Sequence, residues 1–145
     1  MDWNRLLAFA GEHQLLSFAL VGLTLAIVYT ELARLFSGYK AVDPAGLTAL
    51  VNRQDALLVD VSGIADFEKG HIAGARSVQM SQFDADNKVL AKVRELPVIL
   101  TCRTGVTAAE AARKLVKAGF KQVYWLEGGN AAWQQASLPM VRGKG

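Results

Sequence analysis

Hydrophobic residues gather at the start of this chain, where one long segment is free of charge. Residues 14–30 read QLLSFALVGLTLAIVYT, which is 17 residues without a charged side chain or a proline. A helix over this segment is about 26 Å long, close to the roughly 30 Å thickness of the hydrocarbon core of a bilayer. The pattern therefore predicts one transmembrane helix over about residues 14–31, within an N-terminal anchor over residues 1–37.

Two other interpretations of this segment stay open, namely a cleaved signal peptide and a helix that docks on a partner or in a core. The signal peptide is disfavoured because the leading residues carry little charge and no clear A-x-A cleavage pattern follows. The flanking charges indicate an orientation for an anchor. Arg34 and Lys40 follow the segment, whereas Arg5 precedes it together with Asp2 and Glu12. The positive-inside rule then places the C-terminal part in the cytoplasm.

From Tyr39 onward, the hydrophobic runs are short and charged residues are frequent. Three runs have the length and the bounds of strands, and they cover residues 56–61, 97–101 and 122–126, while Ser77-Val78 is expected to form a minimal strand. Helical segments separate them, one starting at Asp43-Pro44 and others over residues 64–69, 107–118 and 130–136. This alternation predicts an α/β domain over residues 38–145, with helices on both faces of a parallel sheet. Residues 31–42 are expected to form the exit of the first helix and a short linker.

Composition narrows the class of protein. The chain has 145 residues, enough for one domain of ordinary size, and its net charge of +3 comes without any run of like charges. Such a charge does not indicate a nucleic-acid partner. The single cysteine, Cys102, cannot form an internal disulfide. Because the two histidines, His13 and His71, lie far from it in the sequence, no metal site is expected.

The end of the strand over residues 97–101 carries the candidate chemistry. Cys102 follows this strand, and the loop Arg103–Thr107 leads into a helix. Backbone N–H groups of such a loop can form an anion-binding nest, to which the helix adds its positive N-terminal end. A thiolate, or the terminal sulfur of a persulfide, is stabilised there without a histidine base, and Arg103 adds a fixed cation. The alternative is a buried and inert structural cysteine.

Four blocks of sequence resemble the rhodanese-like sulfurtransferase family, in the family's order. Residues 58–61 (LVDV) resemble the strand that ends in D-V-R, and residues 66–75 (DFEKGHIAGA) resemble E-[FY]-x-x-G-H-I-x-G-A. Residues 102–108 (CRTGVTA) resemble the active-site loop of thiosulfate sulfurtransferases, and residues 126–133 (LEGGNAAW) resemble L-x-G-G-x-x-x-W. Together the resemblance covers about residues 43–142.

This resemblance implies a rhodanese-like five-stranded parallel sheet flanked by helices, preceded here by one transmembrane helix. It implies that Cys102 takes a sulfane sulfur as a persulfide and passes it to a thiol or protein acceptor, with thiosulfate as laboratory donor and no cofactor. The implied substrate-binding residues are Arg103, Thr104, Gly105, Val106 and Thr107. A short anchored chain of this kind resembles bacterial inner-membrane rhodanese-like proteins, which implies a single-pass protein with its domain in the cytoplasm.

Two further residues are candidates for the site. Asp60 ends a strand near the expected pocket, where it either hydrogen-bonds to neighbouring loops or takes part in sulfur transfer. Arg76 follows a glycine turn and either helps to bind an anion or forms a surface salt bridge. Ser62 stands where the family has the arginine of D-V-R, which the resemblance implies holds the active-site loop by salt bridges. Arg76 is expected to take over part of that role. Thr104 stands where the best thiosulfate enzymes carry a second cation, which predicts measurable but low thiosulfate activity.

The sequence also bears on functions other than sulfur transfer. A phosphatase of the C-x5-R type is excluded because Ala108 occupies the position of its arginine. His71 is expected to be structural rather than a catalytic base, and Trp125 and Trp133 are expected in the core. The main alternative is an interaction module that binds an integral membrane protein, because the small residues of the membrane segment allow close helix packing. The physiological donor and acceptor cannot be read from the sequence.

Overall fold

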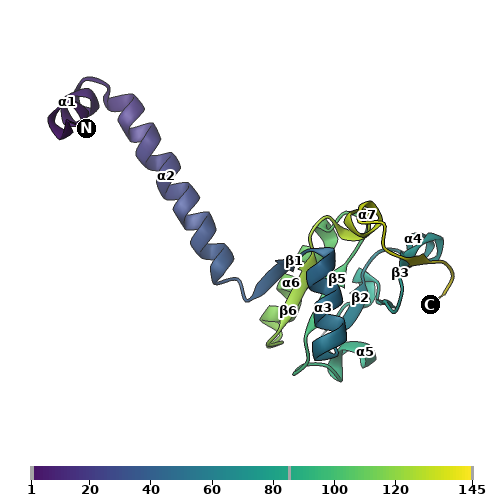
Figure 1. The fold of residues 1–145 in the computed structure, drawn as a ribbon. Helices are drawn as coiled ribbons and strands as arrows, with labels where there is room; N and C mark the ends of the chain where they lie inside the picture. Colours follow the sequence, from purple (N-terminus) through teal and green to yellow (C-terminus); the bar gives the residue numbers. More distant parts are fainter. Residues whose placement is uncertain (1, 85, 145) are drawn as a thin grey trace. The chain divides into compact units, whose positions relative to one another are not determined.

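The computed structural model describes residues 2–84 and 86–144, which divide into two units between Phe36 and Ser37. The first unit consists of α1 (Trp3–Glu12) and α2 (Gln14–Leu35) (Figure 1). Residues Gln14–Ala33 of α2 have a mean hydropathy of 1.9, and this stretch is not buried against other described residues. By length and composition, α2 fits a membrane anchor or a signal sequence.

The second unit is built on a parallel sheet of five strands in the order β1-β6-β5-β2-β4. These strands are β1 (Tyr39–Val42), β2 (Leu57–Asp60), β4 (Arg76–Ser77), β5 (Val98–Thr101) and β6 (Val123–Leu126). A two-stranded antiparallel sheet pairs β3 (His71–Ile72) with β7 (Met140–Val141). The α/β fold with a five-stranded parallel sheet is therefore confirmed.

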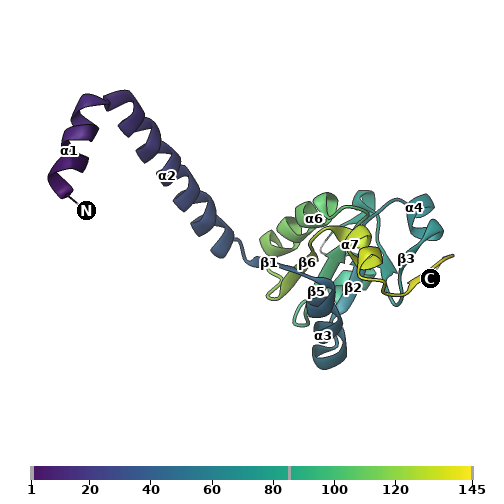
Figure 2. The ribbon, with the colours of Figure 1, turned by 45° about the horizontal axis from the view of Figure 1, so that its top comes forward.

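Helices cover both faces of the large sheet, as Figure 2 shows for α3 and α6. They are α3 (Pro44–Gln54), α4 (Ile64–Lys69), α5 (Lys88–Ala91), α6 (Val106–Lys117) and α7 (Gly129–Gln135), with a 3-10 turn over Met80–Gln82. The start of α3 follows the predicted pattern, because the Asp43 side chain accepts the Gly46 N–H at 2.7 Å and Pro44 is the first helical residue.

The predicted linker is wrong over its last residues. Tyr39–Val42 forms β1, which pairs with β6 in parallel from Tyr39↔Val123 to Val42↔Leu126. β1 is an edge strand, and none of its four residues is fully buried. Lys40 is exposed and the other three are half-buried. Their sequence therefore lacks the continuous apolar run that marks the central strands.

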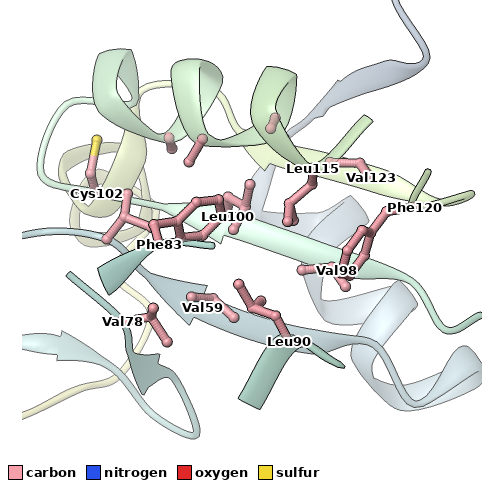
Figure 3. Packing of buried hydrophobic residues seen from close by; sticks show 14 residues of the cluster. Val59, Val78, Phe83, Leu90, Val98, Leu100, Cys102, Leu115, Phe120 and Val123 are labelled. Carbon is pink, nitrogen blue, oxygen red and sulfur yellow. The ribbon is translucent and has the colours of Figure 1, made fainter. Parts of the chain in front are cut away.

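Two apolar cores lie on opposite faces of the sheet because successive strand residues point to opposite sides. Val59 and Leu100 pack toward α6, where Leu115 completes the cluster shown in Figure 3. Their strand neighbours, Leu58 and Ile99, belong to the other cluster, which includes Trp133 of α7. Trp133 is buried as expected, whereas Trp125 is half-buried and packs against the first cluster.

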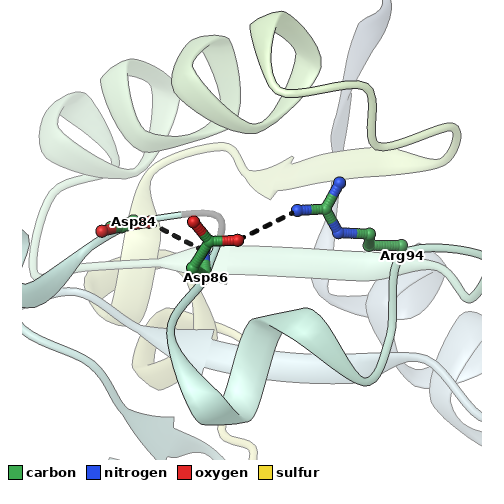
Figure 4. Close-up of polar contacts among 3 residues, drawn as sticks. All are labelled: Asp84, Asp86 and Arg94. Carbon is green, nitrogen blue, oxygen red and sulfur yellow. Dashed lines mark hydrogen bonds and ion pairs between the residues drawn. The ribbon is translucent and has the colours of Figure 1, made fainter.

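The segment around α5 is held by polar contacts at the surface. The Asp84 carboxylate accepts the Asp86 N–H at 2.7 Å, and Asp86 forms an ion pair with Arg94 at 3.5 Å (Figure 4). The Arg94 guanidinium also lies over the Phe120 ring, 5.5 Å from its centroid. These contacts fasten the connection between β4 and β5 and lie outside the candidate site.

Candidate sulfur-transfer site

Cys102 lies directly after β5, at the carboxyl end of a central strand, as the sequence predicts. Its side chain is 4% exposed, and its Sγ accepts the N–H of Gly105 at 3.0 Å. Gly105 adopts a left-handed conformation with φ 93°, and this conformation turns the loop into α6. Glycine adopts it at a lower energetic cost than any residue with a side chain. The loop thus directs at least one backbone donor at the sulfur, which is the arrangement that stabilises a thiolate or a terminal persulfide sulfur.

A cavity of about 450 Å³ opens over Cys102. From the loop and the start of α6, it is lined by Cys102, Arg103, Thr104 and Thr107. The opposite wall comes from the segment after β2 and the segment after β4, and it includes Ser62, Gly63, Asp66, Gln79 and Met80. Of the predicted loop residues, Gly105 is buried and Val106 points outward with 76% of its surface exposed.

Asp60 lies beneath the loop as a fully buried carboxylate, and it does not line the cavity. Its Oδ1 accepts hydrogen bonds from the N–H of Ser62, at 2.8 Å, and from the Ser62 hydroxyl. Its Oδ2 accepts a hydrogen bond from the Asn130 side-chain amide at 3.0 Å. These donors offset the cost of burying the carboxylate, and through them Asp60 joins the segment after β2 to the start of α7.

Asn130 is a site residue that the sequence reasoning missed. Its backbone N–H donates to the Cys102 carbonyl at 2.8 Å, and its side-chain oxygen accepts the Thr101 hydroxyl at 2.8 Å. Together with the bond to Asp60, these contacts join β2, β5 and α7 directly beneath Cys102. A single asparagine after two glycines gives no periodic signal, which is why only the three-dimensional arrangement reveals its role.

Gly129 permits this close approach of α7 to the cysteine loop. It has φ 61°, and a Cβ placed there would lie 2.6 Å from the Gly105 nitrogen and nearer still to the Cys102 carbonyl oxygen. Both atoms belong to the backbone and cannot turn away. The second glycine of the L-E-G-G block is therefore required by packing against the cysteine loop.

Arg76 and His71 lie elsewhere. Both line a separate cavity of about 590 Å³ together with Lys144. His71 is buried, stacks on the Phe67 ring at a centroid distance of 3.7 Å, and has its Nδ1 2.7 Å from the Phe67 carbonyl oxygen. This environment agrees with the structural role expected for His71. The cavity over Cys102 is lined by neither residue, and the partners of Asp60 are Ser62 and Asn130 rather than Arg76.

Comparison with known proteins agrees with this architecture. The model of the rhodanese-like domain matches residues 43–136, which is more than half of the chain. The chain therefore belongs to the rhodanese-like family.

Relatives of this chain fall into two groups by the extent of the match. The Escherichia coli (strain K12) protein YibN, described as uncharacterized, is 39% identical over 142 residues, covering 97% of this chain and 99% of YibN. The thiosulfate sulfurtransferase GlpE of Coxiella burnetii (strain RSA 331) is 32% identical over 96 residues, covering 66% of this chain and 88% of GlpE. The similarity to YibN thus extends into the apolar N-terminal segment.

Solved structures with the same fold include a thiosulfate sulfurtransferase from Pseudomonas aeruginosa, with a TM-score of 0.64 and 28% identity. The match covers 72% of this chain and only 20% of that longer one. The BH2092 protein from Bacillus halodurans has a TM-score of 0.65 over 83% of this chain at 22% identity, which shows the fold alone. The proteins named as thiosulfate sulfurtransferases thus match only part of this chain, 66% for the Coxiella burnetii protein and 72% for the Pseudomonas aeruginosa structure.

Proposed function

We propose that this chain is a membrane-anchored sulfurtransferase, or persulfide carrier, that holds a sulfane sulfur on Cys102. The observation that carries the proposal is the position of the Cys102 Sγ, which accepts the Gly105 N–H at 3.0 Å and lines an open cavity. Arg103, Thr104 and Thr107 line the same cavity and supply one cation and two hydroxyl groups. The names of the GlpE relatives support the same reaction class.

In the proposed reaction, the Cys102 thiolate attacks the outer sulfur of thiosulfate. The sulfur–sulfur bond of thiosulfate breaks, and sulfite leaves with the electron pair. An acceptor thiolate, or cyanide in the laboratory, then attacks the terminal sulfur of the Cys102 persulfide. The bond between the two sulfur atoms breaks, Cys102 returns as a thiolate, and the acceptor leaves as a persulfide or as thiocyanate. Each step conserves charge and electrons without a cofactor.

The two departures from the family pattern bear on activity in different ways. Ser62 takes the place of an arginine, but its N–H and hydroxyl both bind Asp60, so the buried carboxylate keeps its partners. Thr104 lines the cavity and is exposed, where a second cation would attract an anionic donor. We therefore expect low thiosulfate activity because of weak donor binding rather than because of a disordered loop.

The proposed anchor is α2, with the second unit in the cytoplasm of a bacterium at its inner membrane. The apolar stretch Gln14–Ala33 supports this role. The orientation rests on the excess of one positive charge after the segment. Anchoring is tested by flotation of the full chain with lipid vesicles, and orientation by protease access in sealed inner-membrane vesicles.

The intact mass of the purified full chain tests the proposal, measured before and after treatment with thiosulfate. A gain of one sulfur atom that cyanide removes, and that Cys102→Ser abolishes, supports the persulfide. No gain with thiosulfate or with other sulfane donors rejects it. Thr104→Lys adds the missing cation and is expected to lower the KM for thiosulfate by a few-fold, through a charge-assisted contact of about 1 kcal/mol in this exposed place.

A second candidate is an anchored interaction module that binds an integral membrane protein. It is favoured by the small residues of α2, namely Ser17, Ala19, Gly22, Thr24 and Ala26, which allow another helix to pack closely against it. Cys102→Ser separates the two candidates. Loss of the cellular role in this variant supports sulfur transfer, whereas its retention, together with loss when α2 is replaced by a foreign anchor, supports the module.

A further inference from the structure

A second apolar surface lies on α1, and the proposed function does not use it. Its residues follow the i, i+3, i+4, i+7 spacing that places them on one face of a helix, namely Trp3, Leu6, Leu7 and Ala10. None of the described residues Trp3–Glu12 is buried, and Trp3, Leu6 and Leu7 are 72%, 47% and 58% exposed. The opposite face of the helix carries Arg5, Ala8 and Glu12.

The junction between α1 and α2 is a defined turn. His13 leaves the helical conformation with φ −120° and ψ 58°, and it alone separates the two helices. The Ser17 hydroxyl donates to the Ala10 carbonyl at 3.2 Å, and the His13 ring packs against Phe9 at a centroid distance of 4.7 Å. Figures 1 and 2 both show the chain changing direction sharply here. α1 is therefore a separate helix and not a continuation of α2.

The position of α1 next to α2 identifies what covers its apolar face. α2 is the stretch proposed to cross the bilayer, and it begins at Gln14, one residue after the turn. The 10 residues of α1 are too few to cross a bilayer. A helix that turns away from the start of a spanning helix meets the boundary between headgroups and acyl chains. There, an apolar face with a tryptophan is favourable while the charged face stays in water.

We propose that α1 lies in the plane of the membrane interface, with Trp3, Leu6 and Leu7 toward the acyl chains and Arg5 and Glu12 toward water. The proposal rests on the proposed anchoring by α2. Its surface partner is the lipid bilayer itself. An interfacial helix that is joined to a spanning helix by a hydrogen-bonded turn fixes how deep α2 lies in the bilayer. If α2 moved deeper, the charged face of α1 would enter the hydrocarbon core, which is unfavourable.

Single-cysteine labelling of the full chain tests this proposal. In a Cys102→Ser background, Leu6→Cys, Leu7→Cys, Ala8→Cys and Glu12→Cys are each labelled with a polarity-sensitive fluorophore. The proteins are reconstituted in vesicles of phosphatidylcholine and phosphatidylglycerol, with iodide on both sides as aqueous quencher and nitroxide-bearing lipid as membrane quencher. Leu20→Cys, within α2, reports separately on insertion of the span.

The expected result is a face-dependent pattern. Iodide quenches labels at positions 6 and 7 several-fold less than labels at positions 8 and 12, and lipid nitroxide shows the reverse order. Equal quenching at all four positions overturns the inference while a protected label at position 20 leaves the anchoring intact. A label at position 20 that iodide reaches contradicts the anchoring itself, and the inference about α1 falls with it.

Discussion

The two units contain the same kinds of apolar side chain and place them in opposite surroundings. Along α2, the side chains of Leu15, Phe18 and Leu25 are exposed. In β5, Val98 and Leu100 are completely buried between the helices of the second unit. The second unit thus buries most of its apolar residues by its own packing. The apolar residues of α2 stay exposed, as the proposed membrane anchor requires.

This difference separates two kinds of sequence constraint. In the second unit, each apolar side chain meets a particular neighbour, and its shape matters as well as its hydrophobicity. On a helix surrounded by lipid, the side chains meet a fluid of the same polarity, so that hydrophobicity matters and shape matters little. Pairs of matched substitutions, one in each unit, therefore test the comparison.

The largest effect is expected from glycine substitutions. Gly129→Ala forces a Cβ against the backbone of the cysteine loop at a positive φ, and we expect the free energy of unfolding to fall by about 4 kcal/mol. Gly22→Ala has open space around it and leaves unfolding of the second unit unchanged. Urea titration in detergent, followed by tryptophan fluorescence, measures both.

The control for Gly129→Ala is Gly119→Ala. Gly119 also has a positive φ, 93°, but no atom lies within 4 Å of the added Cβ. Its cost is expected to be only the backbone strain of about 1 kcal/mol. Equal losses for the two variants would show that strain, and not the contact with the cysteine loop, explains the need for glycine at position 129.

A smaller effect is expected from removing leucine side chains. Leu100→Ala leaves a cavity between β5 and α6, and we expect a loss of about 3 kcal/mol in the free energy of unfolding. Leu20→Ala removes the same atoms from an exposed position of α2 and leaves that free energy unchanged. A comparable loss for Leu20→Ala would contradict the division of the chain into independent units.

Removal of a buried polar partner comes next. Asn130→Ala takes the amide donor from the Asp60 carboxylate, and we expect the free energy of unfolding to fall by about 2 kcal/mol. Because Asn130 also anchors Thr101 beneath the cysteine, persulfide formation should slow even at temperatures where the variant is folded. Gln134→Ala, on the exposed side of the same helix, is the matched control and leaves both quantities unchanged.

The polar counterpart in the first unit is Thr24, whose hydroxyl donates to the Leu20 carbonyl at 2.8 Å. Thr24→Ala removes a bond that stays within one helix, where the carbonyl also takes part in the helical ladder. Persulfide formation by Thr24→Ala therefore stays at the rate of the unaltered chain, and a slower rate would contradict the independence of the two units.

The smallest effects belong to the surface around α5. Asp86→Asn weakens an exposed ion pair and is expected to change stability by less than about 0.5 kcal/mol. Arg94→Ala costs slightly more, about 1 kcal/mol, because the guanidinium and its stem also cover the Phe120 ring. The same urea titration ranks the two variants. Because Arg94→Ala removes the ion pair as well, equal losses would show that the ring contact adds nothing to stability.

The elements that the sequence predicts well are those whose signal is local. The runs over 56–61, 97–101 and 122–126 contain β2, β5 and β6, because central strands of a parallel sheet are buried on both faces and read as continuous apolar runs. The N-cap at Asp43 is also predictable from the sequence, because the Gly46 N–H that its side chain accepts lies only three residues away. The position of Cys102 at the end of β5 follows from the same local reading.

What could not be predicted depends on distant partners. β1 forms because it pairs with the outer edge of β6, and the residues YKAV alone do not indicate this pairing. Asn130 meets Asp60 across 70 residues of sequence. Arg76 is expected near the cysteine, but in β4, paired with β2, it lines another cavity, the one that His71 also lines. Each of these differences arises from sheet order rather than from residue preference.

The edge strand β1 begins at Tyr39, four residues after Leu35, the last residue of α2. This short spacing decides what proteolysis does to the chain. A cut between Phe36 and Tyr39 releases a domain whose sheet is complete. A cut only a few residues later strips β1 away and leaves the backbone N–H and C=O groups of β6 unpaired along their outer side. The unpaired edge of β6 can then pair with strands of other molecules, which leads to aggregation. The same protease therefore yields either a soluble domain or an aggregate, depending on the peptide bond that it cleaves.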